Sequence, residues 1–120
     1  MTFGYEQLDV AKISRSLIKD VYRISARFPD EERYGLISQV RRAVVSVLLN
    51  IAEGSGRKTS KDFARFLRTS IGSLIEVHAG LQCSIDLEYI EESTYEKIEP
   101  AMKELYFKFI GLEKYLLNKK

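Results

Sequence analysis

The sequence predicts an all-α protein that folds as a single antiparallel, up-down four-helix bundle over residues 1–120. Apolar residues recur every three to four positions in four long segments, which is the period of an amphipathic helix. No segment alternates apolar and polar residues as a half-buried strand would, and the chain has only two prolines. Four such helices joined by short polar turns are typical of a four-helix bundle. A chain of this length is enough for one domain with a real core.

The first two helices are defined by their apolar stripes and by the residues that should end them. The first is expected over about residues 6–28, because the residue before Pro29 avoids the helical conformation. The second is expected over about residues 34–53, with Gly54 closing it in the left-handed conformation that glycine tolerates. The two stripes are Val10, Ile13, Leu17, Val21, Ile24 and Phe28, and Leu36, Val40, Ala43, Val47 and Ile51.

The last two helices carry start signals. The third is expected over about residues 60–87, because Thr59 and Asp62 have the spacing of a capping box. The fourth is expected to begin at residues 93–96, a fuller match to that motif, and Pro100 should kink this helix or delay its start. The stripes are Phe63, Leu67, Ser70, Leu74, Val77, Leu81 and Ile85, and Tyr95, Ile98, Met102, Leu105, Phe109, Leu112 and Leu116.

The chain is expected to be cytoplasmic and to have no membrane contact. Residues 1–12 have neither the basic start nor the apolar run of a signal peptide. The longest apolar stretch, residues 43–52, is too short to span a bilayer. Cys83 is the only cysteine, so no disulfide framework is available and a reducing compartment is expected. We expect this side chain to be a small buried hydrophobe.

The stretch NIAEGSGRKTS, residues 50–60, does not fit a nucleotide-binding loop. A Walker loop has a glycine directly before Lys-Ser/Thr and follows a strand. Here Arg57 separates Gly56 from Lys58, and the preceding element is a predicted helix. The stretch is therefore expected to be a helix stop and a tight turn, and we expect no cofactor.

Catalytic and metal-binding groups are scarce. His78 is the only histidine, and no second His or Cys is spaced to share a metal with it. A hydroxyl nucleophile would need a nearby base. We therefore expect no catalytic or metal-binding residue and no enzyme activity, and we place His78 at the edge of the core or in an interface.

Basic residues are unevenly distributed although the net charge is only +2. Residues 1–80 hold 13 Lys and Arg against 9 Asp and Glu, whereas residues 81–120 hold 6 against 8. Two rows lie opposite the apolar stripes of their helices. On the third helix the row is Lys61, Arg65 and Arg68, and Arg57 and Lys58 precede it at the turn. On the first helix the row is Lys12, Arg15, Lys19, Arg23 and Arg27. Such rows can neutralise several phosphates, but a basic row is also typical of a solvated helix face.

A polar cluster is expected where the second helix ends. Glu53 lies in the last turn, where the helix dipole disfavours an anion, so Arg57, or Arg41 and Arg42 of a neighbouring chain, should compensate it. Asn50 lies one turn earlier. We interpret Asn50, Glu53 and Arg57 as a structural hydrogen-bond network; a functional polar site is the alternative.

The second and fourth helices have more apolar surface than one core can cover. Val45 and Leu49 point away from the core stripe of the second helix. Tyr106, Ile110 and Leu117 form a second stripe on the fourth helix. Exposed apolar patches of this kind mark interfaces, so the sequence predicts a homo-oligomer that uses these five residues.

Two stretches carry a family resemblance. They are RRAVVSVLLNIAEGSGRKTSKDFARFLRTSIGSLIE, residues 41–76, and FPDEERYGLISQVRRA, residues 28–43. The chain resembles the bacterial four-helix-bundle proteins encoded in intervening sequences of 23S ribosomal RNA genes. It is also similar to the accessory protein of diversity-generating retroelements, which works beside a reverse transcriptase. The resemblance implies a homopentameric ring, a link to nucleic acid, and a reverse transcriptase or another protein as a candidate partner.

Two functions follow from these observations. The first is a homo-oligomer that binds nucleic acid through its basic rows, with RNA as the expected ligand. The second is a ring-shaped scaffold for another protein, with no direct contact to nucleic acid.

Overall fold

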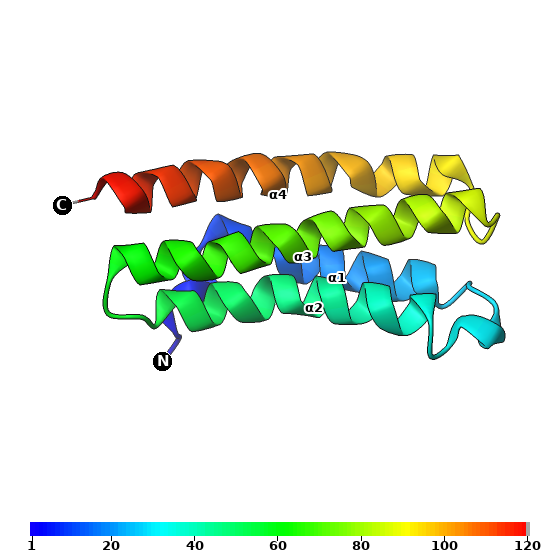
Figure 1. The fold of residues 1–120 in the computed structure, drawn as a ribbon, viewed down its shortest axis with the longest axis horizontal. Helices are drawn as coiled ribbons and strands as arrows, with labels where there is room; N and C mark the ends of the chain where they lie inside the picture. Colours follow the sequence, from blue (N-terminus) through cyan, green and yellow to red (C-terminus); the bar gives the residue numbers. More distant parts are fainter. Residues whose placement is uncertain (120) are drawn as a thin grey trace.

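The computed structural model describes residues 1–119 and contains four α-helices and two short 3₁₀ helices (Figure 1). The α-helices are α1 (Asp9–Ser25), α2 (Leu36–Ser55), α3 (Ser60–Asp86) and α4 (Glu92–Asn118). The 3₁₀ helices are η1 (Gly4–Gln7) and η2 (Asp30–Glu32). The described residues contain no β-strand, so the all-α class is confirmed. None of these helices has an apolar stretch long enough to cross a bilayer.

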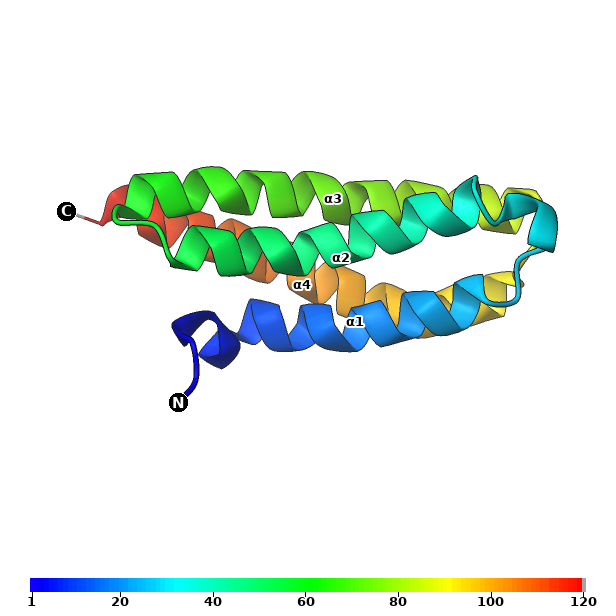
Figure 2. The ribbon, with the colours of Figure 1, turned by 90° about the horizontal axis from the view of Figure 1, so that it is seen from below.

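The helices form an up-down bundle. The α1–α2 connection and the α3–α4 turn lie at one end, and the α2–α3 turn lies at the other, toward which both termini point (Figures 1 and 2). α1 contacts α2 and α4, and α3 also contacts α2 and α4. α1 is therefore diagonal to α3, and α2 is diagonal to α4. The bundle measures 49 × 23 × 23 Å, as expected when its longest helices have 27 residues.

The predicted apolar stripes meet along the axis of the bundle. Val21, Val47, Leu81 and Phe109 are fully buried, one from each helix. Five predicted core residues are only partly buried and pack against the edge of the cluster: Ile13, Leu36, Phe63, Ile85 and Leu112. The stripes are therefore confirmed, with their flanks and ends open to solvent.

α2 and α3 have the most extensive contact of any pair of helices. A Cβ atom at Gly54 would lie 2.7 Å from Cβ of Phe66, and one at Gly80 would lie 2.5 Å from Cγ1 of Val40. Across the same pair, the Ser70 hydroxyl donates to the carbonyl of Val47 at 2.9 Å. The two glycines have no side chain to separate the helices, and the buried Ser70 hydroxyl is satisfied by its hydrogen bond. The backbones of α2 and α3 can therefore approach closely.

The prediction that Gly54 closes α2 in the left-handed conformation is wrong. α2 continues to Ser55, and no glycine among residues 1–119 has a positive φ. Gly54 is small because α3 lies against it. The left-handed residue is Glu88, with φ of 64°, two residues past the end of α3. There the Tyr89 N–H donates to the carbonyl of Ser84 at 2.8 Å, as in a Schellman motif.

Of the helix starts, that of α3 agrees with the sequence signal, whereas those of α1 and α4 differ from it. Thr59 is the N-cap of α3, as predicted, and its hydroxyl accepts from the Asp62 N–H at 3.1 Å. α1 begins only at Asp9, because the preceding residues form η1. α4 begins at Glu92, ahead of the predicted start, and Pro100 lies inside it without delaying it. The proline instead leaves the carbonyl of Glu96 without its usual donor.

Candidate nucleic-acid interface

The predicted basic row on α1 lies on the solvent side of the bundle. Lys12, Arg15, Lys19 and Arg23 are all exposed and extend over about 16 Å of helix. Within residues 1–119, only Arg23 of these four forms an ion pair, with Asp20 at 3.1 Å. We call these four residues the α1 ladder. Three of its four charges are therefore not engaged by a carboxylate.

Arg27, the fifth predicted member of that row, has different surroundings. It lies past the end of α1 and lines a cleft together with Glu88, Glu91 and Glu92. These acidic groups compete with phosphate for the guanidinium. The structure therefore separates Arg27 from the α1 ladder.

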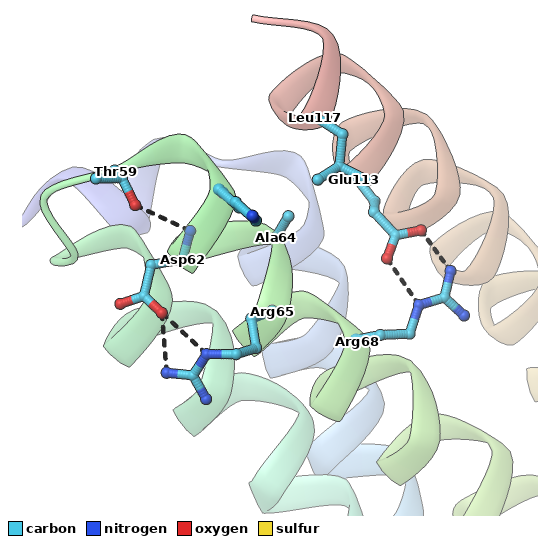
Figure 3. A pocket seen from close by; sticks show the side chains of 8 residues that line it. Thr59, Asp62, Ala64, Arg65, Arg68, Glu113 and Leu117 are labelled. Carbon is cyan, nitrogen blue, oxygen red and sulfur yellow. Dashed lines mark hydrogen bonds and ion pairs between the residues drawn. The ribbon is translucent and has the colours of Figure 1, made fainter.

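The predicted row on α3 begins among carboxylates. The Arg65 guanidinium lies 2.9 Å from Oδ1 of Asp62 (Figure 3). The Arg57 guanidinium lies 3.4 Å from Oε1 of Glu53 and 3.8 Å from Oδ2 of Asp62. Both guanidinium groups also stack over the ring of Phe66, at 4.5 and 4.6 Å from its centroid.

The two lysines of this row, Lys58 and Lys61, are exposed, and neither forms an ion pair within residues 1–119. They are the members of the row whose charge is not engaged by a carboxylate.

Arg68 reaches from α3 to α4. Its guanidinium forms a bidentate pair with Glu113, with Nε 2.7 Å from Oε2 (Figure 3). The Glu113 side chain is only 14% exposed. The hydrogen bond from Arg68 lowers the pKa of Glu113, and the same bond raises the pKa of Arg68. Arg68 faces solvent as expected, but its charge also joins two helices.

The three residues of the predicted polar cluster are only partly brought together. Arg57 pairs with Glu53, which supplies the cation expected at the end of α2. The Asn50 amide instead donates to the carbonyl of Ser46 at 2.9 Å and contacts its hydroxyl at 3.1 Å. Ser46 in turn lies 2.9 Å from the Ser73 hydroxyl of α3. Asn50 thus belongs to the contact between α2 and α3.

The two single residues of chemical interest both lie at the surface. His78 is exposed, and its ring lies edge-on to Tyr95 with centroids 5.9 Å apart. Cys83 is also exposed, so the expectation of a buried cysteine is wrong; it lies on the outer face of α3. Among residues 1–119, no cluster of His, Cys, Asp and Glu could hold a metal ion.

Residues 6–111 match the 23S rRNA-intervening sequence protein family. The chain belongs to this family. The match runs from η1 into the C-terminal part of α4, so it covers all four helices and confirms the resemblance seen in the sequence. No curated protein matches the chain.

In this member of the 23S rRNA-intervening sequence protein family, the predicted assembly residues lie on two diagonal helices. Leu49 on α2 is 59% exposed, and Val45 beside it is partly buried. On α4, Tyr106 and Leu117 are exposed, whereas Ile110 packs against the core. The two patches therefore face different sides of the bundle.

The sequence interpretation missed two exposed apolar residues near Tyr106. Phe107 is 68% exposed, and Ile75 of α3 is exposed beside it. With Tyr106 they line an apolar groove of about 240 Å³ between α3 and α4. A helical wheel places Phe107 far from the core stripe, so this residue could have been found; Ile75 depends on how α3 and α4 pack.

A second group was missed because it forms only where α1 packs beside the start of α2. Tyr22 of α1 and four residues around the start of α2 line an open groove of about 670 Å³. The four are Arg33, Tyr34, Arg41 and Arg42. The Arg41 guanidinium lies 4.5 Å from the centroid of the Tyr22 ring, and that of Arg33 lies 5.8 Å from the Tyr34 centroid. We call these five residues the arginine–tyrosine groove.

Proposed function

We propose that this family member is a non-enzymatic homo-oligomer, a pentamer by its resemblance, that binds RNA through basic surface residues. The observation that carries the proposal is the α1 ladder. Its exposed cations follow one face of α1, and three of the four have no carboxylate partner within residues 1–119. Unpaired cations at this spacing can neutralise phosphates without first losing an internal partner.

The family name is compatible with RNA as the ligand but does not name a ligand. It refers to the intervening sequence of 23S rRNA, so the family is named for an RNA context. The contacts available to the α1 ladder are to phosphates, which carry no base information. Binding through it should therefore depend little on sequence.

Assembly would strengthen each weak contact. Two different apolar patches, on α2 and on α4, favour head-to-tail association in which one patch of each copy meets the other patch of the next. Such contacts can close into a ring, and a ring repeats the α1 ladder once per copy. Several ladders on one RNA give a multivalent interaction that binds more tightly than one ladder alone.

Fluorescence anisotropy with labelled RNA tests the proposal. We expect binding by the assembled protein that weakens steeply between about 50 and 200 mM salt, because counterions released from the RNA drive it. An RNA of unrelated sequence and equal length should bind with similar affinity. Absence of binding at the lower salt concentration would support the scaffold function instead.

Leu49→Arg tests the assembly. A charge in the α2 patch should lower the sedimentation coefficient at micromolar concentration, because an unpaired buried charge is costly in an apolar interface. The helix content measured by circular dichroism should stay unchanged, since Leu49 is largely exposed in the single chain. A wild-type protein that sediments as a monomer would contradict the proposed assembly, whatever the variant does.

A further inference from the structure

We propose that the arginine–tyrosine groove is a second RNA site, which takes unpaired nucleotides by stacking bases on tyrosine and arginine and holding phosphates with arginine. This inference rests on the proposed function, because it assumes that the protein binds RNA. It goes further in naming single-stranded RNA as the ligand and a site distinct from the α1 ladder.

The charge of the groove fits a polyanion. Arg33, Arg41 and Arg42 contribute three guanidinium groups, and no Asp or Glu is among the residues that line it. Within residues 1–119, none of the three forms an ion pair with a carboxylate. Arginine is suited to this task because its planar fork can bind phosphate through two hydrogen bonds.

The aromatic residues of the groove fit unstacked bases. Tyr34 is 89% exposed, so its ring is open to a ligand. Tyr22 carries the Arg41 guanidinium 4.5 Å from its centroid, and an arginine plane can itself support a base. Aromatic rings beside cations are the usual platform for single-stranded nucleic acid, whereas the α1 ladder contains no ring.

Two hydrogen bonds of Arg41 hold the groove in place. Arg41 Nε donates to the Ser25 hydroxyl at 2.8 Å, and its Nη2 donates to the carbonyl of Tyr22 at 3.2 Å. These bonds use only part of the five donors of the guanidinium. The side chain is therefore fixed across the contact between α1 and α2 while other donors remain available.

The connection that carries Arg33 and Tyr34 is also anchored. The Glu32 carboxylate accepts from the Leu36 N–H at 3.1 Å and from the Tyr89 hydroxyl at 2.8 Å. The Phe28 and Tyr89 rings pack with centroids 5.6 Å apart. An ordered connection loses less conformational entropy when a ligand binds than a mobile one would. The anchoring of Arg33 and Tyr34 therefore favours ligand binding at this position.

The stacking geometry selects single strands. The bases of an RNA duplex are stacked on one another and unavailable to tyrosine, whereas loops and unpaired ends expose their faces. The α1 ladder contacts phosphates and should accept both forms. The two sites therefore predict different responses to single-stranded and duplex RNA.

The test measures the affinity of the assembled protein for an unstructured RNA strand, a duplex RNA of equal length and a single-stranded DNA. Tyr34→Ala should weaken binding of the RNA strand by about fivefold or more, as loss of one stacked base does. Tyr34→Phe should retain wild-type affinity, because the ring remains. Arg42→Ala should weaken the same ligand. In Tyr34→Ala and in Arg42→Ala, duplex affinity should change by less than single-strand affinity.

Tyr115→Ala is the matched control. Tyr115 is an exposed tyrosine near the C-terminal end of α4. That end of α4 lies at the opposite end of the bundle from the α1–α2 connection, which carries Arg33 and Tyr34 (Figure 1). Its removal should leave all affinities unchanged. An equal loss with single-stranded DNA supports a stacking site that makes no contact to the 2′-hydroxyl, whereas a loss confined to DNA overturns the assignment to RNA.

Other outcomes separate this inference from the proposed function. If Tyr34→Ala behaves like Tyr115→Ala while the wild type binds both RNA forms, the groove inference fails and the proposed function stands. If the wild type binds neither form, both fail. If Arg42→Ala lowers the sedimentation coefficient and leaves RNA affinity unchanged, the groove is a contact between protein copies, which also overturns the inference; Val45 and Leu49 line its far end.

Discussion

The α1 ladder and the α3 row have similar formal charge but differ in what surrounds that charge. In the α3 row, Arg65 and Arg68 of α3 and Arg57 of the preceding turn all face carboxylates within 4 Å. On α1, Arg23 alone has such a partner among the described residues. A phosphate must displace a carboxylate to reach the α3 arginines, whereas it can approach Lys12, Arg15 and Lys19 directly. A count of basic residues therefore overstates the anion-binding capacity of α3.

The largest expected effect is on RNA binding, when charges of the α1 ladder and of the α3 row are neutralised in separate variants. Arg15→Gln with Lys19→Gln should weaken RNA binding by on the order of tenfold or more at about 0.1 M salt, and should lower the salt slope by about 2, because two phosphate contacts are lost. Arg65→Gln with Arg68→Gln removes the same formal charge. It should leave the slope nearly unchanged, because those guanidinium groups already hold Asp62 and Glu113.

Equal slopes for the two double variants would show that the α3 arginines exchange carboxylate for phosphate, and the distinction between the surfaces would be lost. Anisotropy titrations at several salt concentrations supply both slopes. Unchanged circular dichroism spectra would show that neither variant has altered the helices.

The features that the sequence predicts correctly are set by residues that are close together in the chain. The core stripes follow from a period of 3.6 residues, and buried residues such as Val47 and Leu81 lie where this period places them. The start of α3 follows from the local chemistry of Thr59 and Asp62. These features depend on residues within one or two turns of one another, which a sequence displays directly.

Features that depend on packing between helices were not predictable in the same way. Arg68 and Glu113 are 45 positions apart, and nothing local to either residue indicates the pair. Gly54 suits a left-handed turn by its residue type, but its neighbours in α3 decide its role. The arginine–tyrosine groove likewise requires the α1–α2 connection to bring Tyr22 beside Arg41.

A smaller effect should appear in stability. Arg68→Ala removes the contact between α3 and α4 and should lower the free energy of unfolding by about 0.5 to 1 kcal/mol, the upper range for a solvent-exposed ion pair. Arg15→Ala removes an exposed arginine for which the described residues offer no ion pair, and should change it by less than about 0.5 kcal/mol. Urea denaturation at one fixed protein concentration measures both, since assembly contributes to apparent stability. Equal values for the two variants would mean that the Glu113 contact does not stabilise the fold.

The smallest expected effect is the pH dependence of the stability difference between the wild type and Arg68→Ala. Arg68 lowers the pKa of Glu113 in the folded protein below its ordinary value of 4.5. A lowered carboxyl pKa contributes stability that is fully present above the ordinary pKa and is lost as the pH falls through the folded pKa. The stability difference between the wild type and Arg68→Ala should therefore stay constant from pH 7 to about pH 5.5 and shrink below about pH 4.5.

Glu32 and Glu99 also have lowered pKa values, through hydrogen bonds from Leu36 and Lys103 respectively, but they titrate in both proteins and cancel from this difference. Denaturation series at pH 7, 5.5 and 4 would test it, with Arg15→Ala as the reference that should show no such trend. A difference that persists unchanged at pH 4 would mean that Arg68 stabilises the bundle by packing its aliphatic stem against α4 rather than through its charge.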